Sequence, residues 1–440
     1  MQRMRHLKLI IFASELHNQA SVLNTRSEMF EELRKITDLQ IDYPSSLMAN
    51  SSRISKYIDG GESKGAKLDN ADDCATVCFI ATGGTEEIFR NYTDTLSENA
   101  VLLSDGFHNS LAAALEISSY LGRKGISYRH FNAPLDYSAE FFRNMVDSLF
   151  QRDAGKAPAM TEPAQVPEFP KSVRHSLSKL SIGLIGGQSP WLIASDIDKE
   201  AVSKQYGTSF KEISVEEVVE TFSLTGADDP KVVAVTNRME RFLAADRSKE
   251  DLSEAARMYV ALSRICSLYG LGALTVKCFD LIAACRTTSC LALSLLNEEG
   301  IVAGCEGDIP ALWSMIYAKL AWGQPSFMCN PSSMNRDELT LDLAHCTIPL
   351  QMVHGFRLPS HFESSLGIGV AGSVPSGRFS IIKFSGRELE NFYRTDGEVI
   401  MNTNIPQRCR TQLRFKFDDA ESFDRFLSTD KGNHIILTAR

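Results

Sequence analysis

The chain has 440 residues, of which 46 are basic and 55 acidic, so its formal net charge is −9 and its pI is about 5.6. This balance argues against a dedicated nucleic-acid-binding protein, which usually carries a basic surface to meet phosphate. The composition, 43% hydrophobic and 23% charged, is that of a folded protein and excludes a disordered or collagen-like chain. At about 150 residues per domain, the length predicts two or three domains.

The start of the chain and its cysteines bear on the cellular compartment. A basic opening, MQRMRHLK, precedes an apolar run that is too short for the core of a signal peptide. No stretch approaches the roughly eighteen consecutive apolar residues of a membrane span. The ten cysteines are scattered without a C-x-x-C pair, which is typical of free thiols in a reducing compartment, and each is expected to be a small buried apolar residue. We therefore expect a cytoplasmic protein with no membrane and no nucleic-acid partner.

The first part of the chain alternates strand and helix patterns. Apolar runs predict strands at residues 8–14, 73–84 and 99–105. A helical pattern runs from Asn109 to Gly125, where a glycine stops it. Strand and helix in alternation predict a parallel sheet with helices on its faces.

A change in composition predicts the first domain boundary. Four prolines between residues 157 and 170 are typical of a linker or long surface loop, so the first domain is expected to be 1–170. A second α/β domain is predicted over 171–345, beginning with a strand at 181–187. The remaining residues, 346–440, contain short β runs between glycine, proline and polar turns, which predicts a third, mainly antiparallel β domain.

Polar side chains follow three successive predicted strands. Glu306 comes after the strand GIVAG, just before a helix with Asp308 as its expected N-cap. Asn330 ends the strand PSFMCN, and His345 ends the strand LTLDLAHC. Because ligands bind at the carboxyl ends of the strands in an open α/β sheet, these side chains are expected at one rim. Each alone is typical of a cap or turn residue, but together they favour a site.

A hard cation such as Mn²⁺ or Mg²⁺ would suit these residues, since it prefers oxygen ligands and accepts an imidazole. His434 begins the last predicted strand, after a Gly-Asn turn that can direct its ring toward the domain junction. His361 can equally cap a loop, and His354 is expected to be structural. No histidine has the spacing of a helical zinc motif, so local spacing alone is weak evidence for a metal.

Two glycine-rich turns were considered as nucleotide loops. The turn with Gly183, Gly186 and Gly187 has the order G-x-x-G-G, and the turn with Gly83 and Gly84 also lacks the dinucleotide fingerprint. Neither carries the Lys-Ser/Thr pair of a phosphate-binding loop. We interpret both as positions of close backbone packing and expect neither NAD nor ATP.

Several motifs, taken in order, resemble a known family. The runs CEGDIPALWSM, FMCNPSS, LAHCTIP, HFESSLGIGVAG, CRTQ and GNHIIL resemble the carboxyl-terminal half of the L-fucose isomerase family, with L-arabinose isomerase as a more distant relative. The runs ATGGTEE, HNSLAAALE and IGLIGGQSPWLIAS resemble the first two domains of the shorter fucose-isomerase-like proteins. The likeness covers most of the chain and depends on the shared order of moderately specific motifs.

This resemblance implies an α/β fold with two Rossmann-like domains and a β domain, a homo-oligomer (trimer or hexamer) and a metal-assisted aldose–ketose isomerisation of a small sugar. Glu306 resembles the family's metal-binding glutamate, which also moves the substrate proton, and His434 resembles the metal-binding histidine near the terminus. His345 resembles an additional ligand of the arabinose branch. Asn330 stands where the fucose enzymes have a metal-binding aspartate. The implied cofactor is Mn²⁺ or Mg²⁺.

Asn330 divides the functional hypotheses. An amide oxygen can bind a hard cation, but it brings no charge and cannot act as a base. The first hypothesis is a metal-dependent sugar isomerase that works through an enediol with Glu306 as base. The alternative is a non-catalytic carbohydrate-binding or regulatory protein that keeps the fold and has lost the metal, and a third class is a metal-dependent lyase or epimerase on the same scaffold.

Overall fold

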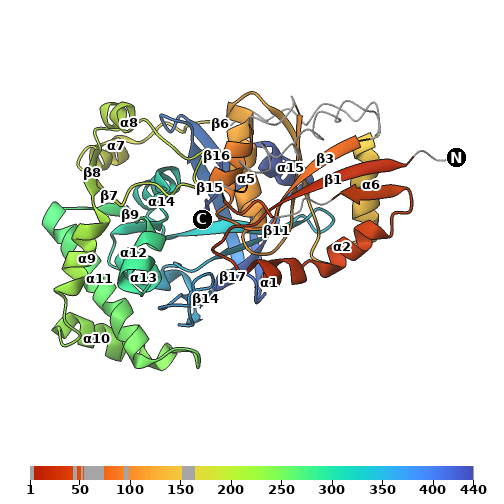
Figure 1. The fold of residues 1–440 in the computed structure, drawn as a ribbon. Coiled ribbons are helices and arrows are strands. Elements are labelled where there is room, and N and C mark those ends of the chain that lie inside the picture. The colour runs from red at the N-terminus through yellow and green to blue at the C-terminus, as the bar shows by residue number, and fades with distance from the viewer. Residues whose placement is uncertain are drawn as a thin grey trace.

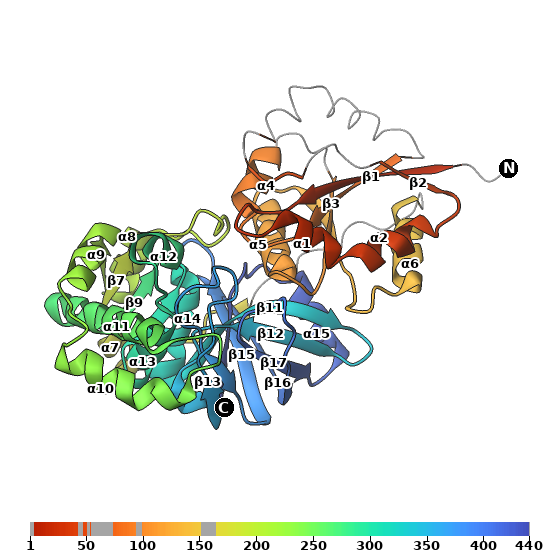
Figure 2. The same cartoon turned by 60° about the horizontal axis from the view of Figure 1, so that its bottom comes forward.

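The structure is a computed structural model, and it describes residues 4–42, 47–50, 53, 74–93, 99–150 and 164–439. Pro158 and Pro163 of the expected linker lie outside these residues. The described chain forms an N-terminal unit (4–150), a middle unit (166–322) and a C-terminal barrel (326–439), which are seen together in Figure 1 and as three adjoining bodies in Figure 2.

The N-terminal unit is a parallel sheet with helices on both faces. Its elements are β1 (Arg5–Phe12), α1 (Gln19–Asn24), α2 (Ser27–Arg34), β2 (Leu39–Asp42), β3 (Cys74–Ile80), α4 (Glu86–Tyr92), β4 (Asn99–Ser104), α5 (Ser110–Arg123), β5 (Ser127–Asn132) and α6 (Ala139–Phe150). The strands are arranged β2-β1-β3-β4-β5. Alternate residues of β1 and β3 enter two separate hydrophobic cores, one on each face. Burial on both faces explains why these strands are almost continuously apolar in sequence.

The middle unit is a second parallel sheet, arranged β10-β9-β7-β8. Its elements are α7 (Lys171–Leu177), β7 (Ser181–Ile185), α8 (Lys199–Tyr206), β8 (Ser209–Ile213), α9 (Val215–Ser223), α10 (Pro230–Met239), η3 (Glu240–Phe242), α11 (Lys249–Tyr269), β9 (Ala273–Val276), α12 (Cys278–Cys285), α13 (Cys290–Glu298), β10 (Val302–Cys305) and α14 (Ile309–Trp322). The long helix α11 begins at a capping box formed by Ser248 and Asp251 and ends at Gly270, which has φ +61°.

The parallel α/β organisation predicted for both units is confirmed, but the Rossmann-like description is not. In the order of their own strands, the first sheet reads 2-1-3-4-5 and the second reads 2-1-3-4. Dinucleotide-binding folds have the order 3-2-1-4-5-6, whereas 2-1-3-4-5 is the flavodoxin-like order. The two sheets therefore share one topology, with the switch point between their first and third strands.

The C-terminal part is mainly antiparallel, as predicted. Its elements are β11 (Ser326–Asn335), β12 (Thr340–His345), η4 (Leu350–Met352), β13 (Gly355–Arg357), β14 (Ala371–Ser373), β15 (Gly377–Ser385), β16 (Asn391–Asn402), β17 (Thr411–Phe417), α15 (Ala420–Ser428) and β18 (Ile435–Ala439). The strands pair in the order β15-β18-β11-β12-β17-β16, and β16 pairs back with β15, so six strands close into a barrel. The short strand β6 (Ala164–Gln165) adds to β16 from outside.

Two strands differ from their expected places. β11 and β12 were expected to continue the second parallel sheet, but both belong to the antiparallel barrel. Asn330 was expected at a strand end, whereas β11 continues past it to Asn335, with Asn330 opposite Ala344. A bulge between Pro331 and Ser333 lets the strand pass a proline that would otherwise interrupt its ladder. The domain boundaries at residues 170 and 345 stay predictions.

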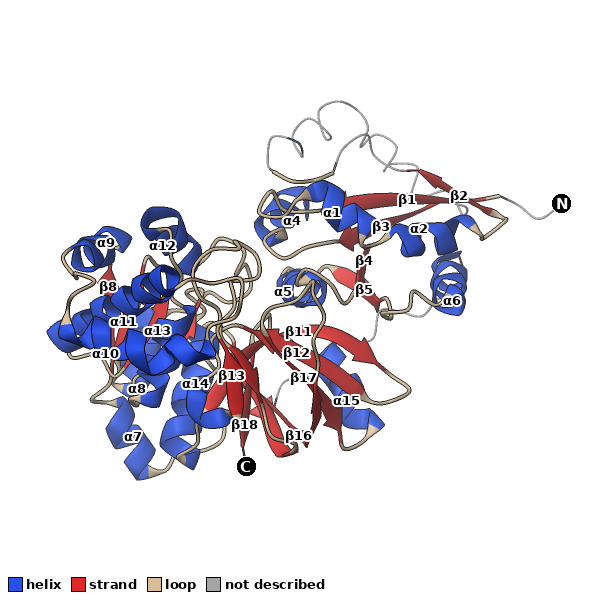
Figure 3. Cartoon of the chain, turned by 90° about the horizontal axis from the view of Figure 1, so that it is seen from below, coloured by secondary structure: helices blue, strands red, loops and turns tan. Residues whose placement is uncertain are grey.

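Helix α5 joins the N-terminal unit to the rest of the molecule. The middle unit and the barrel share one hydrophobic core, and Leu111 and Leu115 of α5 belong to that same core. In Figure 3, α5 lies between the first sheet and the barrel strands. Among the described residues, no helix is long and apolar enough to cross a membrane.

Candidate active site

A cavity lies where the three bodies meet. The N-terminal unit lines it with Gly84 and Glu86, which follow β3, and the middle unit lines it with Trp191 and Glu306. The barrel and its loops contribute Asn330 and Glu363. The loops after β3 and β10 bring the carboxyl-terminal edges of both parallel sheets to this cavity, which is where such sheets bind ligands.

Glu306 is held in place from both its side chain and its backbone. The indole Nε1–H of Trp191 donates to Glu306 Oε2 at 2.6 Å, and the backbone N–H of Ser189 donates to the Glu306 carbonyl at 3.1 Å. At Gly307, which has φ +82°, a Cβ would lie 2.3 Å from the carbonyl oxygen of Gly187. Only glycine permits this approach, and it brings the turn after β7 against Glu306. This agrees with close packing as the role of that glycine-rich turn.

His434 lies immediately before β18 in an uncommon backbone conformation. Its φ of +43° is in the left-handed region, which non-glycine residues rarely adopt. Its backbone N–H donates to Oδ1 of Asn433 at 2.6 Å, and its Nδ1 lies 2.9 Å from Oδ2 of Asp308. The other ring nitrogen, Nε2, is buried and has no hydrogen-bond partner. Strained residues of this kind cluster at functional sites.

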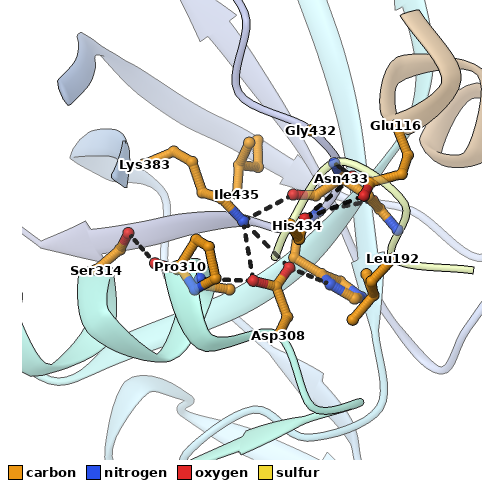
Figure 4. Close-up of polar contacts among 12 residues, drawn as sticks. Glu116, Leu192, Asp308, Pro310, Ser314, Lys383, Gly432, Asn433, His434 and Ile435 are labelled. Carbon is orange, nitrogen blue, oxygen red and sulfur yellow. Dashed lines mark hydrogen bonds and ion pairs between the residues drawn. The ribbon is translucent and has the colours of Figure 1, made fainter. Parts of the chain in front are cut away.

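Asp308 explains how the ring of His434 is oriented. Its carboxylate caps α14 by accepting from the Ala311 N–H at 2.8 Å and forms an ion pair with Lys383 at 3.1 Å; the side chains of Asp308, Lys383 and His434 are fully buried. Burial raises the pKa of Asp308, but the charge of Lys383 and the contact with His434 outweigh it, so the pKa is lowered overall. Figure 4 shows the carboxylate between the two partners. An ionised carboxylate accepts from Nδ1–H, so the lone pair of His434 is on Nε2.

Helix α5 fixes the segment that carries His434. The Glu116 side chain, which is fully buried, accepts from the backbone N–H of Asn433 at 2.7 Å and from that of Ala194 at 2.7 Å. Ser119, one turn further along α5, accepts from the N–H of Gly432 at 2.9 Å. Figure 4 shows Glu116 beside this turn. The N-terminal unit therefore holds the backbone of a residue from the other end of the chain.

Three of the four predicted ligand residues converge. One ligand atom each from Glu306, His345 and His434 lies within 4.8 Å of the other two. Burial lowers the pKa of His345 well below its ordinary value, and electrostatic repulsion from His434 and His361 lowers it further, so the ring of His345 is neutral. Asn330 lines the same cavity as Glu306. The roles of these four residues as ligands stay predictions.

The unpartnered atoms at the site test whether a cation would fit. His434 Nε2 and Asn330 Oδ1 are both buried without a hydrogen-bond partner, which is uncommon because an unpaired buried polar atom costs about 1–3 kcal/mol. One carboxylate, two imidazoles and an amide oxygen suit a divalent transition metal. Since Mg²⁺ is bound mainly through oxygen, this donor set fits Mn²⁺ better than Mg²⁺.

Glu363 is a site residue that the sequence analysis missed, although it lies in the quoted run HFESSLGIGVAG. It lines the cavity with Glu306, and its Oε1 accepts from Asn109 Nδ2 at 2.8 Å. Burial and the nearby charge of Glu306 raise the pKa of Glu363 to about 8, against the lowering effect of the Asn109 hydrogen bond. A carboxylic acid that keeps its proton at neutral pH can both donate and accept one. No local pattern distinguished this glutamate from an ordinary loop residue.

Comparison with curated proteins gives partial matches to one kind of enzyme. The chain is 33% identical over 153 residues to a sulfoquinovose isomerase of Clostridium sp. (strain MSTE9), covering 30% of this chain and 34% of the relative. It is 22% identical over 177 residues to the sulfoquinovose isomerase of Priestia aryabhattai, covering 40% and 39%. The aligned segments thus span little more than a third of the curated relatives. No protein-family model matches the chain. The relatives support a relationship to sugar isomerases, and the L-fucose isomerase family in particular stays a prediction.

Comparison with solved structures gives only weak matches. A C2-type ketoreductase from a modular polyketide synthase matches with a TM-score of 0.25 and 8% identity, covering 62% of this chain and 73% of that chain. An aldolase from Escherichia coli K12 matches with a TM-score of 0.16 and 13% identity, covering 61% and 92%. Matches with TM-scores this low support no conclusion about the fold or the function of this chain.

Proposed function

We propose that the protein is a metal-dependent aldose–ketose isomerase acting on a small sugar. The observation that carries the proposal is the arrangement of His434. Its Nδ1 contacts buried Asp308, its Nε2 has no hydrogen-bond partner, and one of its ring nitrogens lies within 4.8 Å of ligand atoms of Glu306 and His345. A carboxylate that orients a histidine in this way is characteristic of metal sites. The partial likeness to sugar isomerases agrees with this reading.

Glu306, His345 and His434 would hold the cation, with Asn330 as a weaker oxygen ligand. A bound Mn²⁺ would supply Lewis-acid polarisation of the sugar carbonyl. Glu306 would remove the proton from the carbon next to that carbonyl and return it to the former carbonyl carbon, with an enediol between the two steps. Trp191 keeps one Glu306 oxygen oriented through its N–H. The loops from all three bodies would exclude water from the reacting carbons.

Glu363 is proposed as the second acid–base group, since Asn330 cannot transfer a proton. It would move a proton between the two sugar oxygens while Glu306 acts at carbon. Glu363→Gln keeps the size and the contact with Asn109 and removes the exchangeable carboxyl proton, so kcat should fall by about a hundredfold. Mn²⁺ affinity should change little, and Glu363→Asp should recover part of the rate. An unchanged kcat in Glu363→Gln would remove this residue from the mechanism.

The experiment that tests the proposed function is a screen of aldoses for ketose formation by chelator-treated protein, with and without added Mn²⁺. The panel should include sulfoquinovose, because that sugar is named for the relatives, together with neutral pentoses and hexoses. We expect conversion of at least one aldose that depends on the added metal. Conversion of none, with Mn²⁺ present, would contradict the proposal.

A non-catalytic carbohydrate-binding protein is the second candidate, and Asn330 is the observation that favours it. The substitution Asn330→Asp separates the two. If a cation binds here, the new carboxylate should tighten Mn²⁺ binding by about tenfold or more, which is about 1.4 kcal/mol, and should raise turnover.

Without a cation, a carboxylate at position 330 would repel Glu306 and lower stability near neutral pH. Thermal melts of both forms, each with Mn²⁺ and with chelator, decide between the two. If Asn330→Asp melts at a lower temperature than the unaltered protein both with Mn²⁺ and with chelator, the carbohydrate-binding protein is favoured. Stabilisation that requires metal would favour the enzyme.

We also propose a homo-oligomer, a trimer or hexamer, as the resemblance implies. Light scattering at micromolar concentration should then give a mass that is three or six times the 48.7 kDa of one chain. A mass of a single chain would contradict it.

A further inference from the structure

Five of the ten cysteines line one small cavity that Glu306, Asn330 and His345 of the candidate active site also line. They come from positions far apart in the chain: Cys278, Cys290, Cys305, Cys346 and Cys409. All five are buried and free. From the sequence, each cysteine is expected to be a small buried apolar residue, and the local spacing does not predict that five of them line one cavity.

The fold places these thiols by the ends of regular elements. Cys278 and Cys290 are the first residues of α12 and α13. Cys305 ends β10 immediately before Glu306, and Cys346 follows β12 immediately after His345. Cys305 and Cys346 are therefore adjacent in sequence to two of the residues proposed as Mn²⁺ ligands.

Cys290 and Cys346 form the closest pair, with their Sγ atoms 3.2 Å apart. One ligand atom of His361 lies within 4.8 Å of both sulfurs, and all three residues are buried. Two thiolates and an imidazole are a ligand set that Zn²⁺ uses in proteins, with a fourth position left for water. A hard cation such as Mn²⁺ prefers other donors, so this set differs in kind from Glu306, His345 and His434.

The size of the cavity also suits an ion, and the ring of His361 has polar contacts with Ser364 and Glu363. The cavity has a volume of about 10 Å³, which is room for one water-sized particle and too little for a sugar. Nδ1 of His361 lies 3.0 Å from the hydroxyl of Ser364. Nδ1 also accepts from the backbone N–H of Ser364 at 3.3 Å, which puts the ring proton on Nε2, 3.7 Å from Oε2 of Glu363, so a cation bound at Nε2 would replace that proton.

We propose that Cys290, Cys346 and His361 form a binding site for a thiophilic divalent cation of the Zn²⁺ class. The site differs in its donor atoms from the candidate Mn²⁺ site, with which it shares a cavity. The fourth position is open to water or to the neighbouring thiol of Cys409, which lines the same cavity. Binding displaces the thiol protons, so it becomes tighter as pH rises. This site goes beyond the proposed isomerase activity and does not depend on it.

Titration of the full-length, fully reduced protein with Co²⁺ tests the proposal. Co²⁺ bound by thiolates gives an intense sulfur-to-metal charge-transfer absorption, which Co²⁺ bound by oxygen and nitrogen lacks. We expect this absorption to saturate at one equivalent and to be abolished by Zn²⁺. Cys290→Ser and Cys346→Ser should each remove the absorption and weaken Zn²⁺ binding, measured by chelator competition, by about a hundredfold.

Three further variants keep the experiment decisive. Cys266→Ser changes a cysteine that is equally buried in α11 but does not line the cavity, so it should leave the absorption intact. His361→Gln keeps both thiols and should weaken Zn²⁺ binding even if a serine variant folds poorly. Glu306→Gln should reduce Mn²⁺ binding without altering the Co²⁺–thiolate absorption, so failure of one site is distinguishable from failure of the other.

Three results would overturn the proposal. The first is no charge-transfer absorption at saturating Co²⁺, and the second is the same absorption in Cys290→Ser as in the unaltered protein. The third is a disulfide between Cys290 and Cys346, found by peptide mass mapping in protein purified under reducing conditions with Zn²⁺. Their Sγ separation makes that bond the main competing outcome.

Discussion

Replacing Glu306 by Gln is expected to abolish measurable isomerisation. The substitution keeps the shape of the side chain and removes both its negative charge and its ability to take a proton. General-base catalysis typically contributes a factor of about 10²–10⁴, so kcat should fall by at least about a hundredfold. Loss of the charged ligand should also weaken Mn²⁺ binding by about tenfold or more, because charge attraction contributes strongly in a buried site.

Steady-state kinetics and calorimetry with Mn²⁺ measure both effects. Glu338→Gln is the matched control, since its side chain is 57% exposed and lies outside the cavity. Glu338→Gln should leave both kcat and the Mn²⁺ affinity unchanged. Glu306→Gln with unchanged Mn²⁺ affinity would show that Glu306 is not a ligand, and Glu306→Gln with unchanged kcat would show that it is not the base.

Replacing Asp308 by Asn is expected to have the largest effect on stability. Lys383 would keep its buried positive charge without its partner, and breaking a buried ion pair in this way typically costs about 3–5 kcal/mol of unfolding free energy. The amide NH₂ would face Nδ1 of His434 in place of a carboxylate oxygen. The ring would then carry its proton on Nε2, and Mn²⁺ affinity should fall by about 10–100-fold.

A double variant separates these two effects. Lys383→Met added to Asp308→Asn removes the unpaired charge and should recover much of the lost stability, because apolar residues often replace buried ion pairs without loss. It should not recover Mn²⁺ affinity, since the tautomer of His434 is unaffected by residue 383. Urea denaturation and Mn²⁺ calorimetry on the unaltered protein and both variants test this. Full Mn²⁺ affinity in Asp308→Asn would contradict the orientation proposed for His434.

Local signals in the sequence predicted local structure well. Asp308 caps α14 as expected, because a cap is satisfied by a residue within three or four positions. The strands around Glu306 and His345 were predicted from their apolar runs. The order of the strands in the sheets was not predicted, because it depends on how each crossover packs against the sheet and not on any single segment.

Contacts between distant residues could not be predicted from spacing. Asp308 was identified only as a cap, whereas its ion pair with Lys383 spans 75 positions and its contact with His434 spans 126. The continuation of β11 through Pro331 was missed because proline normally ends a ladder, and the bulge that accommodates it depends on pairing with β12. Glu306, His345 and His434 were grouped through family resemblance, which records an arrangement that one sequence does not display.

The most direct test of the proposed active site is the location of Mn²⁺ in a crystal of the protein, by anomalous scattering at the manganese absorption edge. The proposal predicts one strong peak in contact with Glu306, His345 and His434, with Asn330 beside it. Saturating Mn²⁺ that gives no peak among these residues, or a peak only elsewhere in the molecule, would contradict the central claim that this cavity is a metal-dependent catalytic site.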